Sequence, residues 1–151
     1  MDELTIKNHK SDIQAILNCL NKVIDNKTKQ VELYANSKIW VILLEREKEL
    51  LSIANQCKEN LSFIYDVLDH QLLDSEIIKS NMGSKSYSPR KIVFTGEIGK
   101  YRTETHKIKR DFDTLLWVAK NTGSTEREEF LGDCIKKLNY VYSNIAKLEK
   151  F

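Results

Sequence analysis

Apolar side chains recur three and four positions apart through most of this chain, which is the spacing of one face of an α-helix. In the first such stretch, Ser11 and Gln14 form a capping-box pattern that predicts a helix start. The polar run from Asp25 to Thr28 is expected to end it, which gives a first helix over 11–25. Its apolar stripe consists of Ile13, Ile16, Leu17, Leu20, Val23 and Ile24.

The segment from Thr28 to Met82 contains neither glycine nor proline. As one helix of roughly 50 residues it would be about 75 Å long, about twice the length of the other predicted helices. A bundle of matched helices therefore needs a break inside it. We predict this break at the polar stretch Asn55–Asn60, which gives helices over Lys29–Lys58 and Asn60–Ser80.

Within this segment, the run Ile39–Leu44 (IWVILL) is apolar on every side of a helix. A helix that is apolar all round is expected to be buried. We therefore predict that this helix is central in the bundle and that Trp40 lies in the core or at an interface. The run Glu45–Glu49 that follows has no apolar side chain and is expected to emerge into solvent.

An irregular segment is expected over about 81–95. Residues 84–94 are predicted to be extended, because they contain serines, the only proline, Pro89, and then the β-prone Ile92, Val93 and Phe94. Thr95 is a plausible N-cap for the helix that follows.

Two more helices complete the pattern. The fourth is predicted over Gly96–Asn121, and the last begins at a second capping box formed by Thr125 and Glu128. The sequence thus predicts a single all-α domain over 1–151. Its fold is expected to be a four- to five-helix antiparallel bundle with the irregular segment between the third and fourth helices. The stripe of the fourth helix is Ile98, Tyr101, Thr105, Ile108, Phe112, Leu115 and Ala119.

Composition limits the class of protein. The chain has 151 residues, 41% of them hydrophobic and 30% charged, with a net charge of +2. Cys19, Cys57 and Cys134 form no C-x-x-C pair, and their apolar neighbours predict buried, reduced thiols. We find no secretory signal and no apolar run long enough to span a bilayer. These features predict a soluble cytoplasmic protein without membrane contact.

One stretch departs from this balance. Residues 84–110 hold eight lysines and arginines against two acids, a local charge of +6. Basic side chains interleaved with aromatic rings suit an acidic protein surface or the phosphates and bases of a nucleic acid. The candidate binding residues are Lys85, Tyr87, Arg90, Lys91, Lys100 and Arg102.

Catalytic candidates are few. No Glu-x-x-His pair or nucleophile triad is recognisable, so we predict no catalytic residue, no metal and no cofactor. The run His106-Lys107-Ile108-Lys109 resembles the core of histidine phosphotransfer domains, which are also helical bundles. That resemblance implies that His106 carries the phosphate. The bulky Arg110 stands where those domains have a small residue.

The sequence therefore predicts a non-enzymatic protein that acts by binding another protein, as an inhibitor, adaptor or immunity-type partner of bacterial or phage kind. Nucleic-acid binding through 85–110 is the first alternative, and phosphotransfer through His106 is the second. Homo-oligomerisation also stays open, because Lys29–Ser80 has more apolar surface than one short helix can hide.

Overall fold

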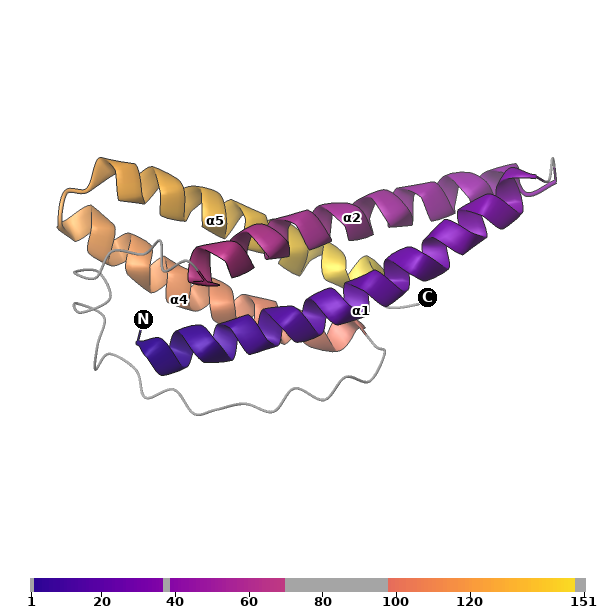
Figure 1. Cartoon of the computed structure of the whole chain (residues 1–151). Coiled ribbons are helices and arrows are strands. Elements are labelled where there is room, and N and C mark those ends of the chain that lie inside the picture. The colour runs from indigo at the N-terminus through magenta and orange to yellow at the C-terminus, as the bar shows by residue number, and fades with distance from the viewer. Residues whose placement is uncertain (1, 37–38, 70–97, 149–151) are drawn as a thin grey trace.

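Four α-helices and two 3-10 turns make up the part of the chain that the computed structural model describes, which is residues 2–36, 39–69 and 98–148 (Figure 1). These residues contain no strand, so the all-α prediction is confirmed. The predicted irregular segment 81–95 lies outside them. The elements in chain order are α1 (Glu3–Ala35), α2 (Val41–Asp69), η1 (Ile98–Lys100), α4 (Tyr101–Asn121), α5 (Thr125–Asn144) and η2 (Ile145–Leu148).

Helix α1 is much longer than predicted. It begins at Glu3 rather than Ser11, because Asp2 is its N-cap and accepts a hydrogen bond from the Thr5 backbone N–H at 2.7 Å. The predicted end at Asp25–Thr28 is also wrong, since the helix continues to Ala35. Polar side chains without glycine or proline leave the backbone ladder intact, so they change the exposed face and not the helix. Its 33 residues span about 50 Å.

The break in the long glycine-free segment lies at 36–40, not at the predicted Asn55–Asn60. Helix α2 runs without interruption through that polar stretch, with Cys57 and Asn60 buried. The Gln56 side-chain amide donates to the Asn60 side-chain oxygen at 3.1 Å. The predicted helices 29–58 and 60–80 are therefore replaced by α1 and α2, and the portion of the second beyond Asp69 lies outside the described residues.

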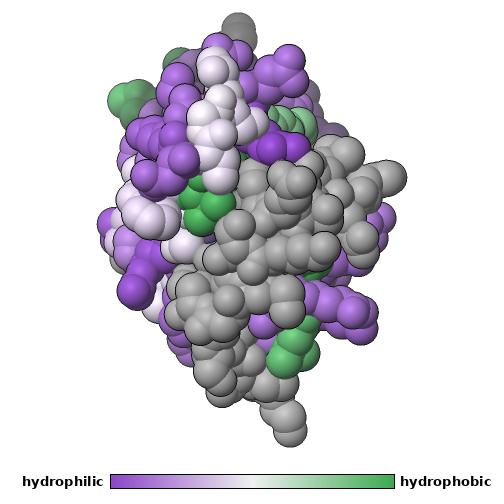
Figure 2. Space-filling model, turned by 90° about the vertical axis from the view of Figure 1, so that its left-hand side faces the viewer, coloured by the Kyte–Doolittle hydropathy of each residue, from purple (hydrophilic) through white to green (hydrophobic). Residues whose placement is uncertain are grey.

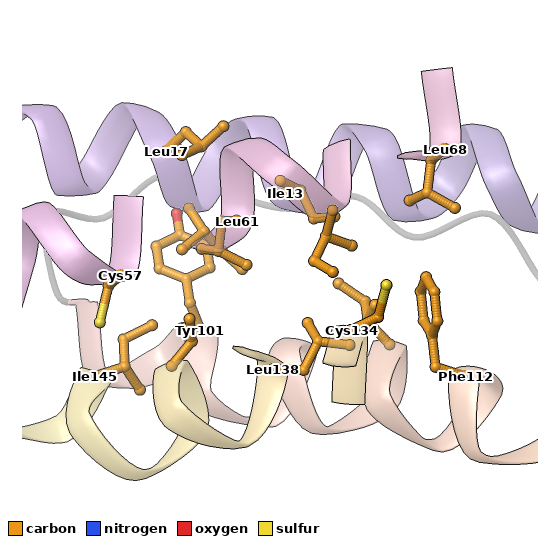
Figure 3. Packing of buried hydrophobic residues seen from close by; sticks show 14 of the residues in the cluster. Ile13, Leu17, Cys57, Leu61, Leu68, Tyr101, Phe112, Cys134, Leu138 and Ile145 are labelled. Carbon is orange, nitrogen blue, oxygen red and sulfur yellow. The ribbon is translucent and has the colours of Figure 1, made fainter. Parts of the chain in front are cut away.

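The helices form two hairpins that pack on each other. Figure 1 shows α1 running beside α2 and α4 beside α5, with the two pairs crossing over a shared core. Figure 3 shows Ile13 of α1 and Leu61 of α2 on one side of the core, facing Leu138 of α5 and Ile145 of η2 on the other. All of these side chains are buried, which confirms the bundle-like packing that the apolar stripes predict.

Helix α4 and the turn after it follow the prediction closely. Every member of the stripe from Ile98 to Ala119 is buried, although the first turn is the 3-10 element η1 and not α-helix. Gly123 adopts φ 71°, and Ser124 N–H donates to the Ala119 carbonyl at 3.1 Å, as in a Schellman C-cap. Ser124 is the N-cap of α5, so the predicted Thr125 capping box is wrong.

The three cysteines are free and buried, as the sequence predicts. Burial raises the pKa of the Cys57 thiol and the Cys134 thiol to about 12. Burial also raises the pKa of Cys19 above its ordinary value. The thiols are therefore protonated at neutral pH and act as small apolar side chains in the core.

Candidate functional site

The α1–α2 hairpin extends well beyond the shared core. Lys27 is the last buried residue of α1, and Ala54 is the first buried residue of α2. We call the part between them, residues 28–53, the arm. Figure 1 shows the arm projecting past α4 and α5 at the side opposite the α4–α5 turn. Leu50 and Ile53 at its base still pack against the shared core, and the remainder of the arm extends beyond it.

The end of the arm is an exposed apolar cluster, which we call the apolar tip. The side chain of Tyr34 packs against Trp40 across the turn, with ring centroids 6.2 Å apart and an interplanar angle of 43°. Trp40 nonetheless keeps nearly half of its surface accessible. The exposed members of the tip are Leu33 (63%), Ile39 (84%), Trp40 (48%), Val41 (55%) and Ile42 (86%).

This result corrects the prediction for Ile39–Leu44. The run lies neither at the centre of the bundle nor in its core: its first four residues are exposed, and Leu43 and Leu44 are only half-buried. The prediction for Glu45–Glu49 fares better, since all but Glu47 are exposed. A run that is apolar on every side favours burial, but it does not say whether the chain itself or another molecule supplies the cover.

An ion pair closes the root of the arm. Lys27 Nζ lies 2.9 Å from Glu47 Oε2, and the side chains are only 7% and 14% exposed. The pair joins α1 to α2 at the point where the apolar core ends. Because a buried charge without its partner is costly, this pair favours one register of the two helices.

Elsewhere the exposed apolar side chains are scattered. Figure 2 views the molecule from the end opposite the arm, where the described surface is largely hydrophilic with separate hydrophobic spots. Among the described residues off the arm, Trp117 on α4 is 67% exposed, and the other large exposed apolar side chains are Leu4 and Phe63, on other helices. Single exposed apolar residues are ordinary on protein surfaces, whereas a contiguous cluster is not.

The structure describes only two of the six binding residues predicted in the basic segment. Lys85, Tyr87, Arg90 and Lys91 lie outside the described residues. Lys100 and Arg102 are exposed, at the end of η1 and in the first turn of α4. The Arg102 guanidinium carbon lies 4.6 Å from the ring centroid of Tyr142 on α5, a cation–π contact that leaves its charge at the surface.

His106 belongs to the same contact. Its ring centroid lies 5.1 Å from that of Tyr142, and the histidine is half-buried. Lys107 forms a 3.7 Å ion pair with Glu104, and Lys109 forms one with Asp113 at 3.6 Å. Two of the five cations from Lys100 to Arg110 are thus paired with acids on the same helix, and one of these acids, Asp113, lies just beyond the stretch that the sequence count covers.

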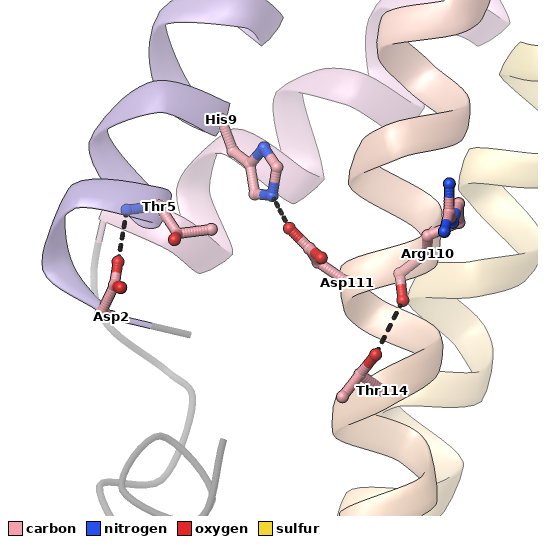
Figure 4. Close-up of polar contacts among 6 residues, drawn as sticks. All are labelled: Asp2, Thr5, His9, Arg110, Asp111 and Thr114. Atoms are coloured by element: carbon pink, nitrogen blue, oxygen red, sulfur yellow. Dashed lines mark hydrogen bonds and ion pairs between the residues drawn. The ribbon is translucent and has the colours of Figure 1, made fainter. Parts of the chain in front are cut away.

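A buried polar pair joins α1 to α4. His9 Nε2 lies 2.7 Å from Asp111 Oδ2, with both side chains almost fully enclosed (Figure 4). Asp12, one turn along α1, is also buried. Sequence reasoning missed this pair, although His9 and Asp111 both fall in the phase of buried stripes. Since solvent does not reach them, the pair positions α1 on α4 and has no access to a substrate.

The described residues contain no group of three or more histidine, cysteine or acidic side chains that could hold a metal ion. Two shallow depressions follow the outer face of α2, lined by polar residues such as Asn55 and Glu59. They lack the apolar enclosure that small-molecule sites have. Over 2–36, 39–69 and 98–148, no helix is long and apolar enough to cross a membrane.

The comparisons with known proteins assign no family. No protein-family model matches the chain, and neither the curated proteins nor the solved structures give a significant match. The functional inference therefore rests on the chain itself. Its most distinctive surface feature in the described residues is the apolar tip.

Proposed function

We propose that this chain is a non-enzymatic, cytoplasmic protein that acts by binding another protein, in the manner of an inhibitor, adaptor or immunity-type regulator. We further propose that the apolar tip is its binding surface, in place of the basic segment favoured by the sequence. The observation that carries the proposal is the clustering of Leu33, Ile39, Trp40, Val41 and Ile42 on a projecting arm.

The composition of the tip supports this role. Interface centres are enriched in aromatic and large apolar side chains, and their rims are polar and charged. Trp40 provides such an anchor, supported by its ring contact with Tyr34. Glu32 on α1 and Glu45 and Arg46 on α2 flank the tip in the sequence. Their charges of both signs suit the polar rim of an interface. The free, buried cysteines favour a reducing compartment.

The test compares Ile42→Asp with Trp117→Asp. Both positions are exposed and apolar, but only the first lies at the tip. Partners are first captured from the native host with the wild-type chain, and binding is then measured with the purified partner. We expect Ile42→Asp to weaken binding by at least about 30-fold, since loss of a central anchor costs about 2 kcal/mol or more. Trp117→Asp should bind like wild type.

Equal binding by both variants would show that the tip is not the binding surface. Circular dichroism checks that the variants are folded. Ile42→Asp should leave the fold intact, because Ile42 is 86% exposed and is not part of the core. Leu33→Lys provides a second tip variant from the other helix of the arm.

Nucleic-acid binding is the second candidate, and the exposed pair Lys100 and Arg102 favours it. The Arg102–Tyr142 stack combines a cation with a ring at the surface, which suits a phosphate and a base. Arg102→Ala should then weaken binding to single-stranded oligonucleotides, and affinity should fall steeply with salt. Absence of binding at low salt would eliminate this candidate.

A further inference from the structure

The arm has many apolar side chains and no buried apolar residue. Its described residues, 28–36 and 39–53, include none that is fully enclosed, whereas Lys27 and Ala54 at its two ends are buried. A two-helix hairpin has a single seam, so it cannot enclose a core. The apolar and aromatic residues of the arm are Val31, Leu33, Tyr34, Ala35, Ile39, Trp40, Val41, Ile42, Leu43, Leu44, Leu50, Leu51 and Ile53.

We propose that a second copy of this chain covers the arm, so that two arms pair side by side as an intermolecular four-helix bundle. This inference rests on the proposed function, because it names the partner of the same apolar surface. Two antiparallel helix pairs form a closed core in four-helix bundles, and each arm supplies one such pair. A two-fold arrangement places the same patch on both sides of the interface.

The size of the surface favours pairing along the arm over contact of the tips alone. The exposed members of the tip amount to about three fully exposed large side chains, and patches of roughly 300–600 Å² are the largest that monomers usually carry. A standard interface needs about 800 Å² from each partner. The half-buried flank residues, such as Leu43, Leu44 and Leu51, provide the remainder only when the arms lie alongside each other.

The charges of the arm favour another copy over a lipid surface. With the Lys27–Glu47 pair set aside, residues 28–53 have four cations and three anions, so each arm is nearly neutral and two copies repel each other little. Peptides that bind at membrane surfaces are usually rich in lysine and arginine. Here the first charge after the tip on α2 is Glu45, which anionic headgroups repel. The charged residues of the arm other than Glu47 are Lys29, Lys38, Arg46 and Lys48, with Glu32, Glu45 and Glu49.

Sedimentation equilibrium over a range of concentrations tests the inference with the full chain. The wild type should pass from 17.6 kDa to twice this mass. Ile42→Asp should raise the dimer dissociation constant by at least about 30-fold. Trp117→Asp, which is exposed but off the arm, should dimerise like wild type. As a second measurement, Ile42→Cys should cross-link to its own copy, since the native thiols are buried.

A wild type that stays monomeric at the highest concentration overturns the inference. A dimer that Ile42→Asp does not weaken, and in which Ile42→Cys does not cross-link, overturns it as well. A monomer that binds vesicles of anionic phospholipid through the tip also overturns it, in favour of a membrane. The proposed function fails separately. If the chain is monomeric but Ile42→Asp loses a different protein, the function stands and only the identity of the partner changes.

Discussion

Removing the Lys27 cation at the root of the arm should destabilise the protein, by an amount that depends on how deeply Glu47 is buried. Lys27 and Glu47 are 2.9 Å apart and 7% and 14% exposed. Breaking a fully buried pair costs about 3–5 kcal/mol, because the remaining charge has lost water and gained nothing. Glu47 keeps some access to solvent, so we expect Lys27→Met to lower the free energy of unfolding by about 2–4 kcal/mol.

The chain provides a matched control for this effect. Lys7 and Glu3 form the same chemical pair at 3.0 Å, but their side chains are 68% and 79% exposed. Lys7→Met should therefore cost about 0–0.5 kcal/mol. The double variant Lys27→Met with Glu47→Leu removes both buried charges and should be within about 1 kcal/mol of wild type.

Urea unfolding followed by circular dichroism measures all four proteins, at a concentration where the chain is monomeric. An unchanged dependence of the free energy on urea would show that the variants differ in stability and not in the unfolded state. The reasoning is refuted if Lys27→Met is no more destabilised than Lys7→Met. It is equally refuted if the double variant is less stable than Lys27→Met.

Three further results are expected. His9→Leu removes the 2.7 Å contact to the buried carboxylate of Asp111 on α4. We expect it to lower the free energy of unfolding in urea by about 3–5 kcal/mol, and a decrease of less than about 1 kcal/mol would contradict this. Burial raises the pKa of Cys57 and Cys134 from 9.0 to about 12. Between pH 9 and 12 the folded chain keeps both thiols protonated, whereas the unfolded chain loses these protons. Under reducing conditions the free energy of unfolding should therefore fall as pH rises, by at most about 1.4 kcal/mol per pH unit for each thiol. The decrease should be smaller in a variant with alanine at both positions. Gly123→Ala should lower the melting temperature through its φ of 71° alone, at a cost of about 1 kcal/mol, while the helical Gly132→Ala should raise it.

The sequence predicts the second hairpin better than the first, and the reason is physical. The stripe of α4 is buried along its whole length, so the spacing of its apolar residues indicates both the helix and its ends. In the first hairpin, the arm leaves the core, and its apolar pattern no longer reports burial. Asn36-Ser37 is the turn signal that could have marked the break, because both residue types favour turns. The polar run 55–60 was misleading, since a helix tolerates it.

The candidate site was less accessible to prediction than the fold. A short apolar run does not reveal whether it is covered by its own chain or by another molecule, so the apolar tip was mistaken for a core element. His9 and Asp111 are 102 positions apart, and only the packing of α1 on α4 brings them together. The local charge count also overstated the basic surface, because it ended at Arg110 and so left out Asp113, which pairs with Lys109.

Because none of the described residues between Lys27 and Ala54 is buried, the molecule is also divided by local stability. Segments with few buried contacts open at a lower free energy than the global unfolding reaction. The arm can therefore fray and re-form as a cooperative unit while the shared core of the two crossed hairpins remains folded. Whatever binds there must first compensate the entropy of holding the two helices straight, which lowers affinity but allows the complex to dissociate quickly.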